Sequence, residues 1–257
     1  HWLRSCSASS GLLSLHLPMK TECLQYFKNP YYWAVIGLGL AARAGLTYLD
    51  FRYRSPQFWE LAADFWNKTG SITMGFLILL VMIRRFSYDM ELRTFPIINS
   101  TAYGRLPLFW NRLIGGEVAV VAAVLLLYAG NTGISCLLGS KMGMSYDWTG
   151  FFTQATVAAF AGSAGYFALS AMICDLSKNH PVAMCLCGLP FASSYFINVD
   201  AVKPPDLFWF LRYGFFTELL RGRTIGSFPV FWSVWYAALI GLTFFFVIQK
   251  RKERKEL

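Results

Sequence analysis

Leu113–Cys136 reads LIGGEVAVVAAVLLLYAGNTGISC, and Glu117 is its only charged residue. A helix needs about 20 apolar residues to cross the hydrocarbon core of a bilayer. Inside lipid each backbone N–H and C=O must find a partner within the segment, so a stretch of this kind folds as a helix. The stretch therefore predicts a transmembrane helix.

Five further stretches have a similar length and composition: Tyr31–Leu49, Phe65–Ile83, Phe151–Cys174, Val182–Val199 and Val230–Ile248. The second of these is the weakest, because Asn67 and Lys68 interrupt it. Charged residues make up only 14% of the 257 residues, whereas soluble domains carry about 25%. We expect an all-α, polytopic membrane protein with six transmembrane helices.

Six spans leave no room for a separate soluble domain, so residues 19–257 are expected to form one transmembrane domain. Residues 1–18 read as an extension from cloning or from an upstream reading frame, because Met19 is a natural start. Lys20–Pro30 mixes charged and apolar residues, which favours a short helix in the membrane interface. Asp200–Pro229 is rich in aromatic residues and predicts short external helices before the last span.

The net charge of +9 is concentrated at the ends of the spans. A basic tail, Lys250–Lys255, follows directly on the last span, as expected for a helix end held at the anionic cytoplasmic leaflet. This placement argues against a role in binding nucleic acid. An even number of spans puts both termini on one side, and the larger share of Lys and Arg on that side predicts cytoplasmic termini.

The longest predicted cytoplasmic segment is Arg84–Asn111, RRFSYDMELRTFPIINSTAYGRLPLFWN. A plain connection between two spans needs only a few residues. The mixed charges, a helix-compatible stretch from Phe86 to Phe95 and two prolines favour a segment that contacts a partner. The alternative is a solvated loop with charges next to the membrane.

Two ionisable residues, Arg43 and Glu117, lie inside predicted spans, where insertion costs about 3 kcal/mol. Either residue could have a functional role within the membrane. Alternatively, Arg43 could extend its long side chain to the outer interface, and Glu117 could extend inward or pair with Arg112.

A metal site near Cys174, His180, Cys185 and Cys187 is conceivable, but buried thiols usually behave as small apolar groups. No metal is therefore expected. A membrane-embedded enzyme would need paired ionisable groups that face a cavity, and the sequence has no H-E-x-x-H, no G-x-S-x-G and no intramembrane carboxylate pair.

From Met19 onward the chain resembles a permease subunit of the ABC-2 type of ATP-binding-cassette transporter. The resemblance rests on the order of its segments and on the residues Asp89–Pro96, Tyr103–Arg105 and Arg112. In that family an acidic residue followed by Thr and Pro lies in a coupling helix, which docks on the ATPase. The resemblance implies a coupling set in this chain: Arg84, Arg85, Tyr88, Asp89, Glu91, Arg93, Thr94, Phe95, Tyr103 and Arg105.

The resemblance also implies the partners. The chain contains no G-x-x-x-x-G-K-[ST] motif, which holds the phosphates of ATP in such transporters, so ATP and Mg²⁺ would bind a separate ATPase chain. Six helices are half of the usual translocator, which implies a second permease copy or a sister permease. The chain is similar to single-domain, six-helix permeases encoded beside separate ATPases, several of which export antimicrobial peptides or confer immunity to them. The expected substrate is an antimicrobial peptide, a drug or a lipid-like molecule, and the expected location is the bacterial plasma membrane. A membrane accessory or immunity protein that binds without transporting remains the alternative.

Overall fold

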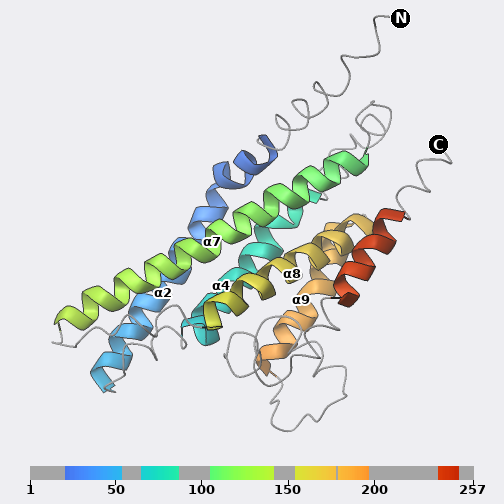
Figure 1. Ribbon diagram of the computed structural model, residues 1–257. Helices are drawn as coiled ribbons and strands as arrows, with labels where there is room; N and C mark the ends of the chain where they lie inside the picture. The colour runs from blue at the N-terminus through green and yellow to red at the C-terminus, as the bar shows by residue number, and fades with distance from the viewer. Residues whose placement is uncertain are drawn as a thin grey trace, which may run out of the picture.

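The computed structural model describes residues 21–53, 65–86, 105–141, 154–177, 179–196 and 237–248. Within these ranges every element is a helix and no strand occurs (Figure 1). A short helix over residues 21–28 precedes α2 (Pro30–Tyr53). Helix 65–86 alternates α-helical and π-helical turns, with η1 (Trp66–Gly70), α4 (Ser71–Phe76) and η2 (Leu77–Met82). The later helices are α7 (Arg105–Lys141), α8 (Gln154–Ser177), α9 (His180–Phe196) and Ala237–Ile248.

Three helices of the described part are long and apolar enough to cross a membrane, namely Pro30–Tyr53, Leu108–Lys141 and Ala159–Ser177. They indicate a membrane-embedded protein. Helix 65–86, α9 and Ala237–Ile248 overlap the other three predicted stretches. The all-α prediction is confirmed for the described residues, and three of the six predicted spans are matched by helices long enough to cross a membrane. Residues 1–18 and Asp200–Pro229 lie outside the described residues.

Helices α2 and α7 run in the same direction. The hydroxyl of Tyr26, just before α2, donates to the carbonyl of Arg112 at 3.2 Å. One turn and a half further on, Tyr32 donates to the carbonyl of Ala119 at 2.8 Å. Because the partners advance together along both helices, the intervening helix 65–86 must return between them.

Helix α8 runs against α7 and α9. Tyr166 of α8 donates to the carbonyl of Cys187 in α9 at 2.9 Å, while Cys174, near the end of α8, donates to the carbonyl of Ile83 at 3.4 Å. The ring of Phe246 lies 4.8 Å from that of Phe109 at the start of α7. We call the end of the bundle where residues 21–28, Phe86 and Phe109 meet the Glu22 end; it lies at the upper right of Figure 1.

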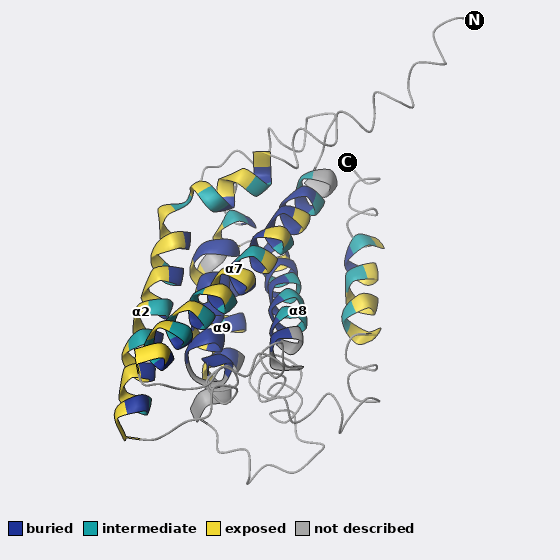
Figure 2. Cartoon of the chain, turned by 60° about the vertical axis from the view of Figure 1, so that its left-hand side comes forward, coloured by how far each residue is buried: buried dark blue, intermediate teal, exposed yellow. Residues whose placement is uncertain are grey.

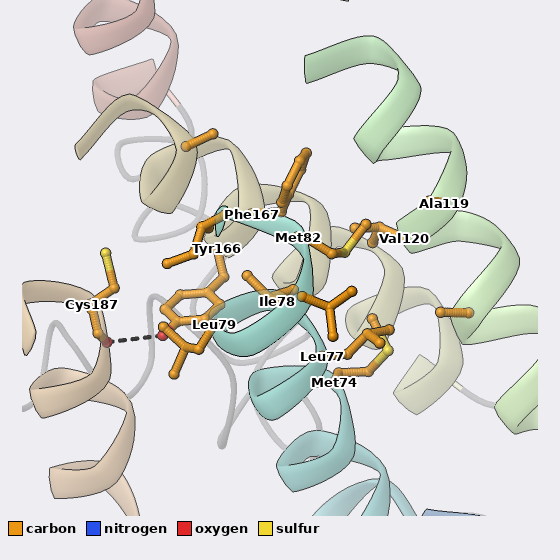
Figure 3. Close-up of a cluster of buried hydrophobic side chains, with 14 of the residues drawn as sticks. Met74, Leu77, Ile78, Leu79, Met82, Ala119, Val120, Tyr166, Phe167 and Cys187 are labelled. Atoms are coloured by element: carbon orange, nitrogen blue, oxygen red, sulfur yellow. Dashed lines mark hydrogen bonds between the residues drawn. The ribbon is translucent and has the colours of Figure 1, made fainter. Parts of the chain in front are cut away.

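Helix 65–86 forms the centre of the core. It contacts α2, α8 and α9, and most of its side chains are buried (Figure 3). Its exposed apolar side chains, Ile72, Phe76 and Leu80, form one narrow stripe at helical spacing. Residues 74–83 of this helix are apolar on all sides, as expected for a segment in the interior. By contrast, α2 shows a broad exposed face on the outside of the bundle (Figure 2).

Two glycines allow the core helices to approach closely. A Cβ on Gly116 of α7 would overlap the ring of Phe167 in α8, and a Cβ on Gly75 would overlap the ring of Phe191 in α9. Both rings occupy the space above a bare backbone. Small residues at such positions are a common way to pack helices in membranes.

Candidate functional site

Three charged side chains meet at the Glu22 end of the bundle. Oε2 of Glu22 lies 3.2 Å from Nε of Arg85, which is at the end of helix 65–86. The same oxygen lies 3.7 Å from Nε of Arg112 in the first turns of α7. Glu22 and Arg112 are buried and Arg85 is half-buried, so one carboxylate joins the ends of two core helices. We call these three residues the Glu22 cluster.

The short helix that carries Glu22 lies directly on α7. Glu22 and Tyr26 are buried one turn apart, whereas Leu24, Gln25 and Lys28 are exposed. A Cβ on Gly115 would lie 3.1 Å from the backbone nitrogen of Cys23, so a larger residue here would push the two backbones apart by a few tenths of an ångström. Burial raises the pKa of the Cys23 thiol, and burial, followed by the Glu22 charge, raises that of the Tyr26 phenol.

Asn29 connects this short helix to α2. Pro30 ends the first helix because it cannot continue the backbone hydrogen-bond ladder, but it fits the first turn of the next one. The side-chain oxygen of Asn29 accepts the backbone N–H of Tyr31 at 3.0 Å, as a helix N-cap does. The two helices are thus joined by a single residue.

The structure places only the edges of the predicted coupling set. Arg84 is exposed and Arg85 is half-buried at the end of helix 65–86, and Arg105 is the first residue of α7. The remaining members lie outside the described residues: Tyr88, Asp89, Glu91, Arg93, Thr94, Phe95 and Tyr103. The rings of Phe86 and Phe109, which bound the segment, are 5.4 Å apart, so both edges lie at the Glu22 end.

Arg43 forms a second buried site, in the middle of α2. Its side chain is 0% exposed, its Nε donates to Oδ1 of Asn131 in α7 at 2.9 Å, and its guanidinium carbon lies 5.8 Å from the ring centroid of Phe65. The alternative that Arg43 extends to the outer interface is therefore wrong: the side chain turns into the bundle. A cation inside a membrane protein needs such partners, and here α7 and helix 65–86 provide them.

Further polar side chains continue this buried layer. Thr47, one turn after Arg43, and Ser135, one turn after Asn131, are both fully buried. Across from α2, the Thr73 hydroxyl donates to the carbonyl of Thr69 at 2.7 Å. The polar faces of α2, α7 and helix 65–86 thus lie inward over two turns, while α2 directs apolar groups outward.

Glu117 lies half-buried on α7, between exposed Val118 and buried Gly116. The carboxylate that pairs with Arg112 is that of Glu22, which the sequence analysis did not single out. Asn131 was also missed. The sequence marks both residues only weakly. Glu22 is an acidic residue in a mixed interfacial stretch, and Asn131 is an amide in a long apolar span.

Comparison of the chain with protein-family models, curated proteins and solved structures gives no match.

Proposed function

We propose that this chain is the transmembrane subunit of an ATP-binding-cassette exporter of the ABC-2 type, driven by a separate ATPase chain. It acts as a permease without catalytic chemistry of its own. Residues 87–104, with Arg84, Arg85 and Arg105 at their edges, would contact the ATPase. The substrate would be an amphipathic molecule such as an antimicrobial peptide, a drug or a lipid.

The observation that carries the proposal is the placement of the two edges of this segment. Helix 65–86 ends and α7 begins at the same end of the bundle, with Phe86 and Phe109 in contact. The short helix of residues 21–28 lies beside both edges through Glu22. An ATPase docked on residues 87–104 would therefore act on three helices at once.

The proposal includes six spans, cytoplasmic termini and insertion in the bacterial plasma membrane. The alternating directions of the described helices support an even number of spans, because residues 21–28 and the end of Ala237–Ile248 lie at the same end. That end would face the cytoplasm. Two copies, or this chain and a sister permease, would enclose the path.

Affinity purification tests the proposal. The full chain, tagged at its C-terminus, is expressed in its native host and extracted in a mild detergent, and the proteins that co-purify are identified by mass spectrometry. We expect an ATPase chain with a G-x-x-x-x-G-K-[ST] motif in stoichiometric amount. A preparation without any ATPase, from cells that contain the folded protein, would instead favour a non-transporting accessory or immunity protein.

A further inference from the structure

We propose that Glu117 and an exposed apolar stripe beside it on α7 bind a phospholipid with a primary-amine headgroup, such as phosphatidylethanolamine. The stripe consists of Ile114, Val118, Val121 and Leu125. The ammonium group of the lipid would lie against the Glu117 carboxylate, and one acyl chain would follow the stripe toward the centre of the membrane. This site does not depend on the proposed transport function.

Glu117 lies inside an apolar span without a partner of its own. It is the only charged residue of Leu113–Cys136. Among the residues that the structure describes, its carboxylate forms neither an ion pair nor a hydrogen bond. Arg112, the nearest cation in the sequence, lies next to Glu22 instead. A carboxylate in the membrane is costly and usually pairs with a cation, and the lipid ammonium would supply that partner.

The neighbours of Glu117 show which face of α7 its side chain occupies. The four residues of the stripe follow one another at helical spacing and are between 42% and 49% exposed (Figure 2). Glu117 is three residues after Ile114 and four before Val121, so it is next to both on the helix surface. On its other side, Gly116 faces the ring of Phe167 in α8. Glu117 thus lies where the packed core meets the apolar outer surface.

The depth of Glu117 matches the position of a lipid headgroup. It is four residues after Leu113, where the apolar run begins, which is about 6 Å along the helix axis. Trp110 lies two turns before Glu117, on the same side of α7, and is half-buried, as is typical of aromatic residues at the membrane interface. An amine just inside this ring reaches the carboxylate, while the phosphate of the lipid stays in the hydrated headgroup layer.

A primary ammonium fits a carboxylate better than the other common headgroups do. Like the ammonium of lysine, it carries a positive charge and three N–H donors, so it makes charge-assisted hydrogen bonds. The trimethylated headgroup of phosphatidylcholine has the charge but no N–H donor. Phosphatidylglycerol has no cation at all. The site should therefore distinguish lipids by their headgroup and not only by their acyl chains.

The charge of Glu117 disfavours a second copy of the chain as the occupant of the stripe. Most homodimers have a two-fold interface, in which the same patch of both subunits meets. Pairing α7 with α7 through this stripe would bring two Glu117 carboxylates together in an apolar layer, where like charges repel strongly. A lipid offers the opposite charge together with an apolar chain.

Native mass spectrometry of the full chain, purified in detergent and freed of lipid, tests the site. Phosphatidylethanolamine, phosphatidylcholine and phosphatidylglycerol with identical acyl chains are titrated separately, and the Kd of the first bound lipid is measured. We expect phosphatidylethanolamine to bind about tenfold more tightly than phosphatidylcholine, as for one additional hydrogen bond between charged groups. Equal Kd values for these two lipids would refute the site without the use of any variant.

Variants then assign the preference to Glu117. Glu117→Gln removes the charge at nearly constant shape and should abolish the preference, whereas Glu117→Asp keeps the charge and should retain most of it. Asp50→Asn, at a half-buried acidic residue near the far end of α2, is the matched control and should bind lipid as the parent does. A preference that persists in Glu117→Gln would place the lipid elsewhere and overturn the inference. If Glu117→Gln weakens binding of dodecylammonium but not of phosphatidylethanolamine, Glu117 binds a free amine, and the assignment to a lipid is wrong.

Discussion

Arg43 and Asn131 bind each other across two parallel helices, with the Nε of the arginine 2.9 Å from the amide oxygen of Asn131. Both side chains are almost completely buried. An arginine in the middle of an apolar span thus donates to an amide oxygen of a neighbouring helix. The amide oxygen accepts one of the five donor hydrogens of the guanidinium.

Replacing Asn131 with Leu should destabilise the protein. The substitution removes the acceptor of Arg43 Nε, and leaving a buried charged donor without an acceptor costs about 1–3 kcal/mol. Unfolding of the detergent-purified protein by SDS titration would measure the loss. Leu137→Ala, at an exposed position on the same helix, is the control. Equal stability of the two variants would show that the bond contributes nothing.

Removing both partners together should cost less than removing Asn131 alone. In the double variant Arg43→Met with Asn131→Leu, no charge remains to be desolvated, and such replacements are often neutral or stabilising. In the same SDS titration, the double variant should therefore be more stable than Asn131→Leu. A double variant less stable than Asn131→Leu would instead show that the arginine stabilises the bundle through other contacts.

Gly116→Ala should destabilise the contact between α7 and α8. The added Cβ overlaps the ring of Phe167, which is fully buried and cannot move away freely. Overpacking of this kind typically costs about 1–3 kcal/mol. Gly133→Ala is the matched control, because nothing lies within 4 Å of its Cβ position. A thermal unfolding curve for Gly116→Ala that coincides with that of Gly133→Ala would contradict the prediction.

Reversing the charges of Glu91 and Arg93 should uncouple ATP hydrolysis from transport. The double variant Glu91→Lys with Arg93→Glu keeps the net charge, so membrane insertion should not change. Rim charges mainly control specificity and association rate, and their reversal should weaken binding of the ATPase at physiological salt. Co-purification measures this effect, with Lys203→Glu on the predicted external side as the control. If the variant still binds the ATPase and transports normally, Arg84–Asn111 has no coupling role and is only a connecting loop.

Labelling of single cysteines in intact cells should reveal the orientation. A cysteine at Lys203 should react with a membrane-impermeant maleimide, and one at Lys252 should react only after the cells are opened. The excess of basic residues beside the termini is the physical reason. The reverse pattern would place the Glu22 end outside and remove the basis of the coupling proposal.

The sequence was sufficient to predict the helices but not their contacts. Long apolar runs such as Leu113–Cys136 demand a helix whatever surrounds them, since lipid offers no hydrogen bonds to the backbone. The π-helical turns η1 and η2 were not predicted, because π-helix is rare and no residue pattern in this segment marks it. The one sequence feature that coincides with this irregularity is the interruption of the apolar run at Asn67 and Lys68, which lies inside η1.

The charged contacts were harder to predict because they join distant residues. Glu22 and Arg85 are 63 residues apart, and Arg43 and Asn131 are 88 apart. A single sequence shows that Arg43 needs a partner inside the membrane, but many polar residues could serve. Glu22 lies in an interfacial stretch. An acidic residue there can be solvated by water, so the sequence alone does not indicate that it needs a partner in the protein.

The length of α7 has a consequence for the amplitude of any motion. Its 37 residues would extend about 55 Å, well beyond a hydrocarbon core of about 30 Å. If α7 tilts as a rigid rod about Gly116, where Phe167 presses on its backbone, its two arms are unequal. A tilt of about 10° would move the Arg105 end by about 3 Å and the Lys141 end by about 6 Å. The helix would thus act as a lever that doubles, at Lys141, a displacement of its Arg105 end.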